Sequence, residues 1–228
     1  MTPPASQRIQ IVVNDATQVS GLLDQPRGSQ ICVILAHGAG AGMEHPSMGG
    51  LTRDLTEHGI ATLRYQFPYM ERSGKRPDPP PLCHATVRAA VSTARQLAPG
   101  LRLIAGGRSF GGRMTSQAQA ATPLTGVGGL VFFGFPLHPS GKPSIERAAH
   151  LSRIKVPMLF LQGTRDMLAD LDLLQPLIEK LPPATLRVLD GADHSFHVLV
   201  RSGRSNADVS REMMEAFCEW ASSLPQNE

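Results

Sequence analysis

The sequence Gly107-Arg108-Ser109-Phe110-Gly111 has a serine between two glycines, a spacing that is typical of a nucleophile elbow. In such an elbow the serine lies on a tight turn between a strand and a helix, and the glycines let neighbouring backbone approach closely. An apolar run precedes the motif and an alanine-rich stretch follows it. This context predicts Ser109 as a nucleophile; the structural alternative is a glycine turn with a capping serine.

A serine hydroxyl is a weak nucleophile and needs a histidine base that a carboxylate orients. Asp166 follows the apolar run 156–161, and His194 follows the apolar run 185–189. If both runs are parallel strands, their carboxyl ends meet at the sheet edge that also carries Ser109. The sequence therefore predicts a Ser109, His194 and Asp166 triad, whose chemistry is acyl transfer.

Neighbouring residues offer alternatives within this arrangement. Asp166 could instead begin a turn or cap a helix, and Asp170 and Asp172 lie further along the chain. Asp193 is expected to shape the turn in which it lies. His197 is expected in the core or behind the site, because the chain becomes apolar there (FHVLV).

A glycine-rich segment, HGAGAG at residues 37–42, follows another apolar run. Loops of this kind supply one amide of an oxyanion hole. We expect Ala39 to supply that amide, with Gly40 as the alternative, and Phe110 to supply the second. Each donor of such a pair contributes about 3–4 kcal/mol in the transition state. His37 is expected to bond the loop backbone rather than to act in catalysis.

The same glycines do not fit two nucleotide-binding motifs. A dinucleotide fingerprint that starts at Gly38 requires a third glycine at the position of Met43. A phosphate loop that starts at Gly107 reaches Gly112 and then meets Arg113 instead of lysine. His and Cys residues do not have zinc-site spacing either. We therefore expect no cofactor and no metal.

Composition excludes several classes of partner. The 228 residues carry a net charge of +3, and their 22 Lys and Arg are scattered, whereas a nucleic-acid interface needs clustered cations. No apolar run reaches the ~18 residues that a membrane span requires. The three cysteines form no CxxC pair, and the first ten residues show no secretory leader. The expectations are no nucleic acid, no membrane and a cytoplasmic location; the sequence carries no signal for an oligomeric state.

Apolar runs alternate with helical stretches, a pattern that predicts an α/β fold with a mostly parallel sheet and helices on both faces. Strands are expected at residues 8–13, 19–23, 31–36, 60–65, 101–105, 127–133, 156–161 and 185–189. Helices are expected at 46–58, 82–98, 114–122, 170–181 and 206–222, and a loop at 67–81. Only about 22 residues separate the sixth and seventh strands, which is too few for a lid. We expect one domain over residues 1–228.

With these residues placed, the chain resembles the α/β-hydrolase superfamily in its dienelactone-hydrolase-like branch. It most resembles the testis-expressed and NSL-complex subunit 3 type hydrolase-like family. The matching stretches are HGAGAGMEHP (37–46), LRYQFPYMERSGKRPDPP (63–80), GGRSFGGRM (106–114), FPLHPSGKP (135–143), LFLQGTRD (159–166), ADHSF (192–196) and GRSxxDV (203–209).

The resemblance implies Ser109 as nucleophile, His194 as base, Asp166 as its orienting carboxylate, and oxyanion amides near Ala39 and Phe110. Dienelactone hydrolases carry a cysteine at the elbow, where this chain has serine. The resembled family also includes scaffold proteins, so the alternative to an enzyme is a catalytically silent interaction protein. Such a protein would keep the fold and present its proline-rich loop to a partner.

The sequence predicts a serine esterase or thioesterase that acts on a small or exposed acyl substrate. Its pocket is expected to be shallow and bordered by residues 68–81 and 135–143. Tyr69, Arg108 and His138 are candidates for substrate binding. Arg108 and Arg113 flank the nucleophile and could bind an anionic substrate, but the simpler expectation is that both face solvent.

Overall fold

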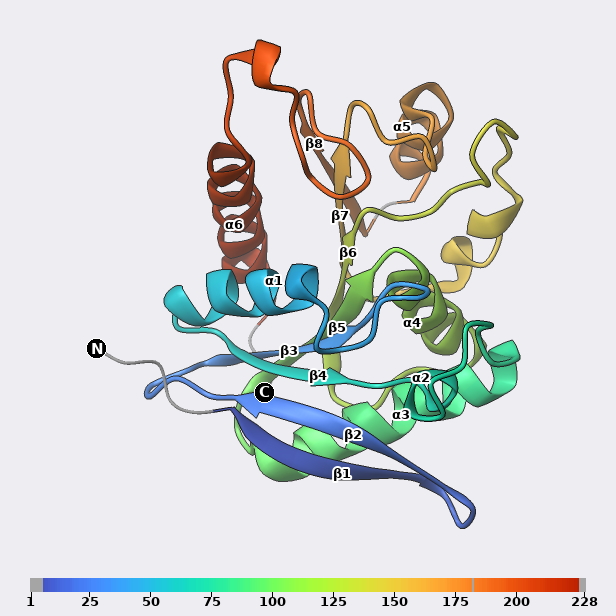
Figure 1. The fold of residues 1–228 in the computed structure, drawn as a ribbon, viewed down its shortest axis with the longest axis vertical. Coiled ribbons are helices and arrows are strands. Elements are labelled where there is room, and N and C mark those ends of the chain that lie inside the picture. The colour runs from blue at the N-terminus through green and yellow to red at the C-terminus, as the bar shows by residue number, and fades with distance from the viewer. Residues whose placement is uncertain (1–5, 182, 226–228) are drawn as a thin grey trace.

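A sheet of eight strands in the order β1-β2-β4-β3-β5-β6-β7-β8 forms the centre of the computed structural model, which describes residues 6–181 and 183–225 (Figure 1). The strands are β1 (Gln7–Asn14), β2 (Thr17–Asp24), β3 (Ile31–Ala36), β4 (Ala61–Tyr65), β5 (Arg102–Arg108), β6 (Val127–Phe133), β7 (Met158–Gly163) and β8 (Ala184–Leu189). β1 and β2 form an antiparallel hairpin, and β2 is antiparallel to β4. The six strands β4, β3, β5, β6, β7 and β8 pair in parallel in that order. This arrangement confirms the predicted α/β architecture.

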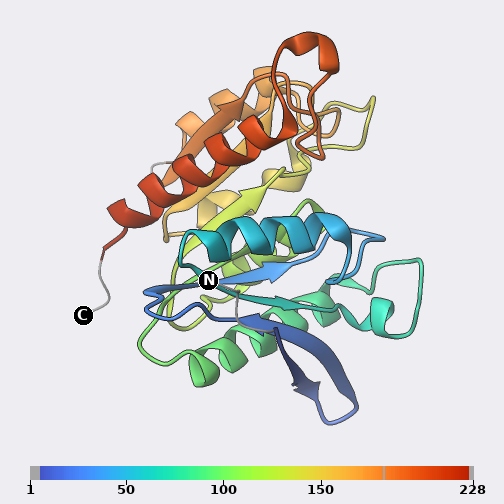
Figure 2. The same ribbon diagram turned by 60° about the vertical axis from the view of Figure 1, so that its left-hand side comes forward.

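Helices cover both faces of this sheet (Figures 1 and 2). They are α1 (Pro46–Glu57), α2 (Pro68–Glu71), α3 (Pro80–Leu97), α4 (Phe110–Ala121), α5 (Leu171–Glu179) and α6 (Asn206–Ser223), with the short turns η1 (Glu146–Ala148), η2 (Leu151–Arg153) and η3 (Val200–Ser202). One apolar core lies between the sheet and α3, α4 and α5, and a second lies between the sheet and α1 and α6. The sheet therefore has two buried faces.

The strand β3 shows why its sequence forms the middle of such a sheet. Ile34 packs into the core under α3 and α4, whereas Val33 and Leu35 pack into the core under α1 and α6. All three are at most 1% exposed. An uninterrupted apolar run is what a strand covered on both faces requires.

At the serine motif the expected end of the strand, residue 105, and the expected start of the helix, residue 114, are both wrong. β5 continues to Arg108, and α4 already begins at Phe110. The glycines at 106 and 107 continue the strand instead of ending it. A Cβ on Gly106 would lie 1.9 Å from the carbonyl oxygen of Val131 in β6. Glycine is therefore needed here for close strand packing, and the elbow is tighter than expected.

The segment 67–81, which is expected to be a loop, contains α2 and the first turn of α3. Pro68 and Pro80 each occupy the first turn of a helix, with Pro79 as the residue that precedes α3. Proline is favoured there because its missing N–H would have no helical partner. The prolines that suggest a loop therefore mark two helix starts.

Only η1 and η2 lie between β6 and β7, which confirms the absence of a lid domain there. In the part of the chain that the structure describes, no helix has both the length and the apolarity needed to cross a bilayer.

Candidate active site

Ser109 lies in the turn between β5 and α4 with φ 47° and ψ −116°. A positive φ is unfavourable for a residue with a side chain, and such strain is the mark of a nucleophile elbow. The Ser109 N–H donates to the Phe133 carbonyl at 3.2 Å, and its carbonyl accepts from the Arg113 N–H at 3.1 Å. Bonds to β6 and α4 thus hold the serine in its strained conformation.

The glycines of the motif let the end of β3 approach this turn. A Cβ on Gly107 would lie 2.2 Å from the Ala36 carbonyl oxygen, and one on Gly111 would lie 2.4 Å from the same atom. Side chains at these positions would force β3 away from the elbow. The approach brings the next segment of the chain beside the serine, because a Cβ on Gly38 would lie 3.9 Å from the Ser109 Cβ.

Asp166 and His194 form a hydrogen bond of 2.7 Å between Oδ2 and Nδ1. Asp166 is buried in the turn after β7, where its Oδ1 also accepts from the Leu168 N–H at 2.8 Å. His194 lies on the loop after β8, and 26% of its side chain is exposed. With Nδ1–H donated to the carboxylate, Nε2 is the nitrogen that can accept a proton.

Ser109 and His194 both lie beside the end of β6. Ser109 bonds the Phe133 carbonyl, and a Cβ on the next residue, Gly134, would lie 3.4 Å from the ring of His194. Within residues 6–181 and 183–225, no hydrogen bond joins the serine hydroxyl to this ring. In unliganded enzymes this contact is often long and tightens when substrate binds.

The loop 37–42 after β3 is fixed by the segment after β4. The Gly40 N–H donates to the Tyr69 hydroxyl at 3.1 Å. The Nε2 atom of His37 accepts from the Phe67 N–H at 3.0 Å, so its Nδ1 carries the proton that is donated to the Gly38 carbonyl at 2.8 Å. The expected role of His37 in bonding the loop backbone is confirmed. Burial lowers the pKa of this histidine to about 4, so the ring is neutral.

The alternative residues near the triad have other contacts. Asp170 caps α5 by accepting from the Asp172 N–H at 3.0 Å. Asp193 accepts from the backbone N–H groups of Ser195 and His197 at 2.8 and 2.9 Å, which confirms that it shapes its turn.

The expectation that His197 lies in the core is wrong, because its side chain is exposed. The chain leaves the core after this residue and forms the protruding segment around η3 (Figure 1). Val200, at the start of η3, is 98% exposed. Of the apolar residues in FHVLV, Phe196 is buried and Val198 packs against the second core, whereas Leu199 and Val200 are exposed.

The expectation that Arg108 faces solvent is wrong. Its guanidinium donates to the His194 carbonyl at 3.2 Å and lies 5.6 Å from the centre of the Phe196 ring. It lines a separate hollow of about 260 Å³ with Ser195 and Phe196 instead of the cavity beside Ser109. Arg108 thus ties the loop of the histidine to the residue before the serine.

Tyr69 and His138, the other candidates for substrate binding, also make internal bonds. Tyr69 is 2% exposed, its hydroxyl accepts from Gly40, and its N–H donates to Asp78 at 2.7 Å. The Nε2 of His138 accepts from the Asp170 N–H at 2.9 Å, and its Nδ1 lies 2.9 Å from the Pro139 carbonyl. His138 therefore holds the 135–143 segment against the start of α5.

Gln162 is a member of the site that sequence reasoning does not identify. It is fully buried, its side-chain oxygen accepts from the Phe135 N–H at 2.9 Å, and its amide donates to Asp166. The available signal is a polar residue in the otherwise apolar stretch LFLQG, one residue after the expected strand end. A buried amide of this kind must have partners, and here it orients the carboxylate.

A cavity of about 570 Å³ opens beside Ser109. Its lining residues are Ala39, Arg76, Pro77, Asp78, Pro80, Ser109, Phe110, Arg113, Met114, Gln117, Pro136, Pro139, Arg147 and Leu168. The expected borders at 68–81 and 135–143 are confirmed.

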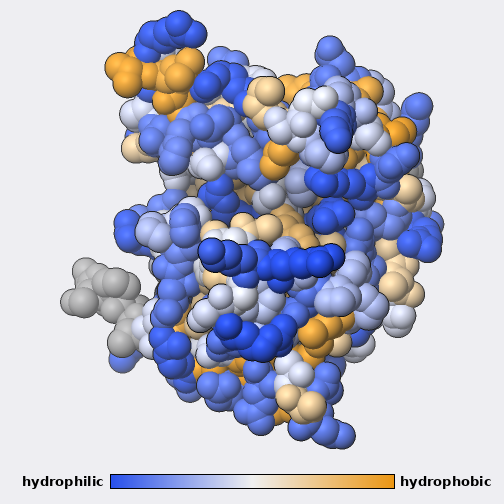
Figure 3. Space-filling model, turned by 45° about the vertical axis from the view of Figure 1, so that its right-hand side comes forward, coloured by the Kyte–Doolittle hydropathy of each residue, from blue (hydrophilic) through white to orange (hydrophobic). Residues whose placement is uncertain are grey.

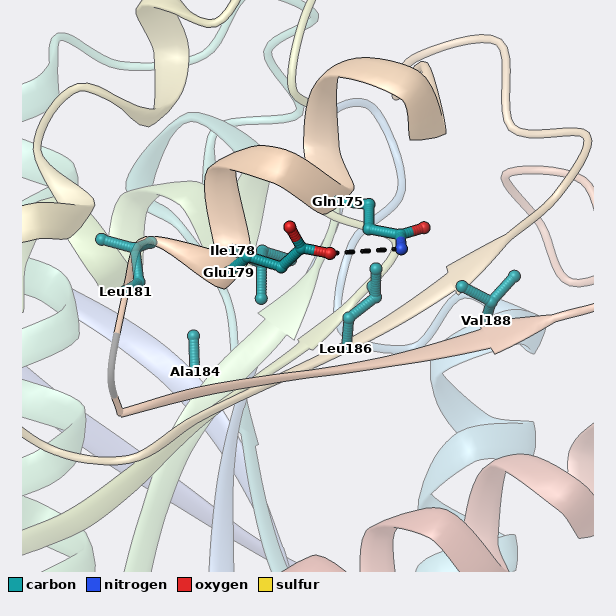
Figure 4. Close-up of a pocket in the computed structure, with 7 residues that line it drawn as sticks. All are labelled: Gln175, Ile178, Glu179, Leu181, Ala184, Leu186 and Val188. Atoms are coloured by element: carbon teal, nitrogen blue, oxygen red, sulfur yellow. Dashed lines mark hydrogen bonds between the residues drawn. The ribbon is translucent and has the colours of Figure 1, made fainter.

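A second pocket, of about 400 Å³, lies between α5 and β8 (Figure 4). Its two polar side chains bond one another, since the Gln175 amide donates to Glu179 at 3.3 Å. Its described lining residues include no serine, cysteine or histidine. Across the described ranges, no three side chains of His, Cys, Asp or Glu gather as metal ligands would.

Solved structures share this architecture. The chain is similar to an α/β serine hydrolase without a lid from Xanthomonas campestris, with 20% identity, 100% of this chain and 99% of that chain covered, and a TM-score of 0.74. A dienelactone hydrolase from Anabaena variabilis is 22% identical over 96% of this chain and 99% of that chain, with a TM-score of 0.73. An α/β serine hydrolase homologue from Coxiella burnetii is 19% identical over 95% and 98% of the two chains, with a TM-score of 0.73.

The similarity at these identities shows an α/β-hydrolase fold without a lid. The family is shown by sequence, because residues 29–222 match the alpha/beta hydrolase domain family. The chain belongs to this family.

Proposed function

We propose that the protein is a serine esterase or thioesterase that acts on a small or exposed acyl substrate through Ser109, His194 and Asp166. One observation carries this proposal. The strained serine turn and the hydrogen-bonded Asp166–His194 pair both lie at the carboxyl ends of parallel strands, and Ser109 lines a cavity. The dienelactone-hydrolase-like neighbours and the family membership agree with a hydrolase.

The first half of the reaction forms an acyl-enzyme. His194 Nε2 takes the proton of the Ser109 hydroxyl while Oγ attacks the acyl carbon of the substrate. The tetrahedral intermediate collapses, the bond to the leaving alcohol or thiol breaks, and His194 returns the proton to that group. Asp166 stabilises the imidazolium in between.

The second half releases the acid. Water attacks the acyl carbon and gives its proton to His194, and the bond to Ser109 Oγ then breaks. The proton returns to Oγ, so the free serine is restored and the net reaction consumes one water.

The oxyanion formed in both halves would accept from the backbone N–H groups of Phe110 and Ala39. Phe110 begins α4, where the first N–H groups have no helical partner. Ala39 lines the same cavity as Ser109, whereas the Gly40 N–H already donates to Tyr69. These contacts favour Ala39 over Gly40 as the first donor.

The resemblance to the NSL-complex subunit 3 type family raises the alternative of a silent interaction protein. The proline-rich segment that such a protein would present is engaged here, because Pro80 starts α3 and lines the cavity with Pro77. The strained backbone of Ser109 has a use in catalysis and none in an interaction protein, so we favour the enzyme over the silent protein.

A fluorophosphonate probe tests this function, because it reacts only with an activated serine. We expect the probe to label the wild-type protein at Ser109 and to leave Ser109→Ala unlabelled. Circular dichroism checks that both proteins are folded. Absence of labelling on folded wild type would overturn the proposal.

A further inference from the structure

Three arginines line the cavity beside Ser109. Arg76 comes from the segment between α2 and α3, Arg113 from α4, and Arg147 from η1. Within the described part of the chain, none of the three side chains forms an ion pair or a hydrogen bond. In the space-filling view of this side of the molecule, hydrophilic side chains extend across the surface with apolar patches between them (Figure 3).

Arg113 is the most constrained of these arginines. Its Nε atom is buried without a hydrogen-bond partner in the described residues, and its guanidinium lies 6.0 Å from the centre of the Phe110 ring. Burial lowers the pKa of Arg113, and the positive charge of Arg147 lowers it further. Two guanidinium groups therefore lie near one another in a partly desolvated place, which is unfavourable unless an anion joins them.

No acidic side chain of residues 6–181 and 183–225 forms an ion pair with these three arginines. Asp78 is the one carboxylate among the described lining residues of the cavity. Its Oδ1 accepts from Arg72 at 2.6 Å and its Oδ2 accepts from the Tyr69 N–H at 2.7 Å. Behind the cavity, the pKa of His150 is lowered to about 4, first by burial and then by Arg153 and Arg113. Asp78 is therefore already bonded to other groups, and the neighbouring His150 carries no negative charge that could offset Arg113.

We infer that Arg113 and Arg147, with Arg76 at the rim, bind an anionic group, a carboxylate or a phosphate, on the substrate whose acyl carbon Ser109 attacks. This inference rests on the proposed function. A guanidinium presents paired N–H donors that match the two oxygens of such a group. The serine and the arginines share one cavity of about 570 Å³, so the anionic group and the acyl carbon belong to one small molecule. The substrate class is thus a short acyl ester or thioester with a negatively charged end.

The test compares two esters of equal length, mono-p-nitrophenyl glutarate, which ends in a carboxylate, and p-nitrophenyl pentanoate, which is neutral. We expect wild type to prefer the glutarate ester at least about tenfold in kcat/KM, as for one charged hydrogen-bonded contact. A 4-phosphonobutanoate ester, compared in the same way, distinguishes a phosphate site from a carboxylate site. Added salt should reduce the preference.

Variants assign this preference to residues. Arg113→Gln and Arg147→Gln should each lower the ratio of the two kcat/KM values about tenfold. Arg147 is partly exposed on the short turn η1, outside the long helices, so its variant keeps the test valid if Arg113→Gln fails to fold. Arg53→Gln is the matched control, because Arg53 is an exposed arginine of α1 on the opposite face of the sheet. Its ratio should equal that of wild type.

A binding measurement separates this inference from the proposed function. Calorimetry with glutarate and Ser109→Ala requires no turnover, and we expect binding that Arg113→Gln weakens about tenfold. If wild type hydrolyses both esters equally, or if glutarate does not bind, the anion site is overturned while the esterase proposal stands. If no ester is hydrolysed and the fluorophosphonate probe does not react, the esterase proposal fails, and the glutarate measurement alone decides the anion site.

Discussion

The serine side and the histidine side of the site are held in place by different means. On the serine side, backbone packs on backbone, so that a Cβ on Gly111 would lie 2.4 Å from the Ala36 carbonyl oxygen. On the histidine side, side chains hold an exposed loop, through the bond from His194 to Asp166 and the bond from Arg108 to the His194 carbonyl. Close packing tolerates almost no change, whereas separate hydrogen bonds can be removed one at a time. The two sides should therefore respond differently to substitution.

The largest effect is expected at Ser109 itself. Ser109→Gly and Ser109→Ala both remove the proposed nucleophile, and the hydrolysis rate of a p-nitrophenyl ester should fall at least about 1,000-fold in each. Glycine accepts the φ of 47° without strain, so Ser109→Gly should be about 1 kcal/mol more stable than Ser109→Ala. Urea unfolding of the two variants measures this difference. Equal stabilities would show that the elbow holds no strain.

The packing on the serine side predicts a large loss of stability for Gly111→Ala. The new Cβ would meet the backbone of Ala36 and His37, which cannot move without displacing β3. We expect the free energy of unfolding to fall by about 3 kcal/mol or more.

Gly50→Ala is the matched control for this packing, because nothing lies within 4 Å of the added Cβ and the residue is inside α1. This variant should gain up to about 1 kcal/mol from the higher helix propensity of alanine. Similar urea midpoints for the two glycine variants would contradict the packing argument.

Acid should weaken the serine side through His37, which joins the loop 37–42 to Phe67. Burial lowers the pKa of His37 to about 4, whereas in the unfolded chain it is near 6.5. The unfolded state therefore binds more protons between these values, so the stability is full above about pH 6.5 and is lost as the pH falls toward 4. At pH 5 this ring should account for a loss of about 2 kcal/mol.

Urea unfolding at pH 7 and pH 5 of wild type and His37→Gln measures this contribution. Wild type should lose more stability than the variant, while His150, with its pKa of about 4, contributes equally to both. The same loss in both proteins would mean that His37 is not held neutral by burial.

The smallest effect is expected from the histidine side, at Arg108. Arg108→Gln removes the bond to the His194 carbonyl and the contact with Phe196. Because the loop that carries His194 is then held less firmly, kcat/KM should fall about tenfold. Arg108→Lys should restore part of the loss. The pH dependence of kcat/KM should shift as well, which a purely structural role would not produce.

Arg165→Gln is the control for Arg108. Arg165 also donates to a backbone carbonyl of this region, that of Gly191 at 3.1 Å, but it forms no hydrogen bond with His194. Its substitution should change kcat/KM less than twofold. Equal losses in the two variants would remove the special role of Arg108.

The sequence predicts backbone placement well in this molecule. Asp166 and His194 are predictable as neighbours because each follows an apolar run that becomes a parallel strand, and such strands end at one edge. β3 and β6 are predictable to the residue because a strand buried on both faces is apolar throughout.

Contacts between distant side chains are not predictable in the same way. Arg108 reaches His194 across 86 positions, and nothing in the local letters distinguishes it from an exposed arginine. Arg76, Arg113 and Arg147 come from three segments whose relative positions depend on loop conformations. The prolines of 67–81 mislead for a related reason, since proline is favoured both in loops and at helix starts.

The central claim, acyl transfer through Ser109, is tested most directly by trapping the acyl-enzyme. Wild type is mixed with excess p-nitrophenyl acetate, quenched in acid within the first turnovers, digested and analysed by mass spectrometry. We expect an initial burst of about one p-nitrophenolate per protein and one acetyl group on the peptide that contains Ser109. Hydrolysis of the ester with the acetyl group on another residue, or with an unmodified Ser109 peptide and no burst, would contradict the claim.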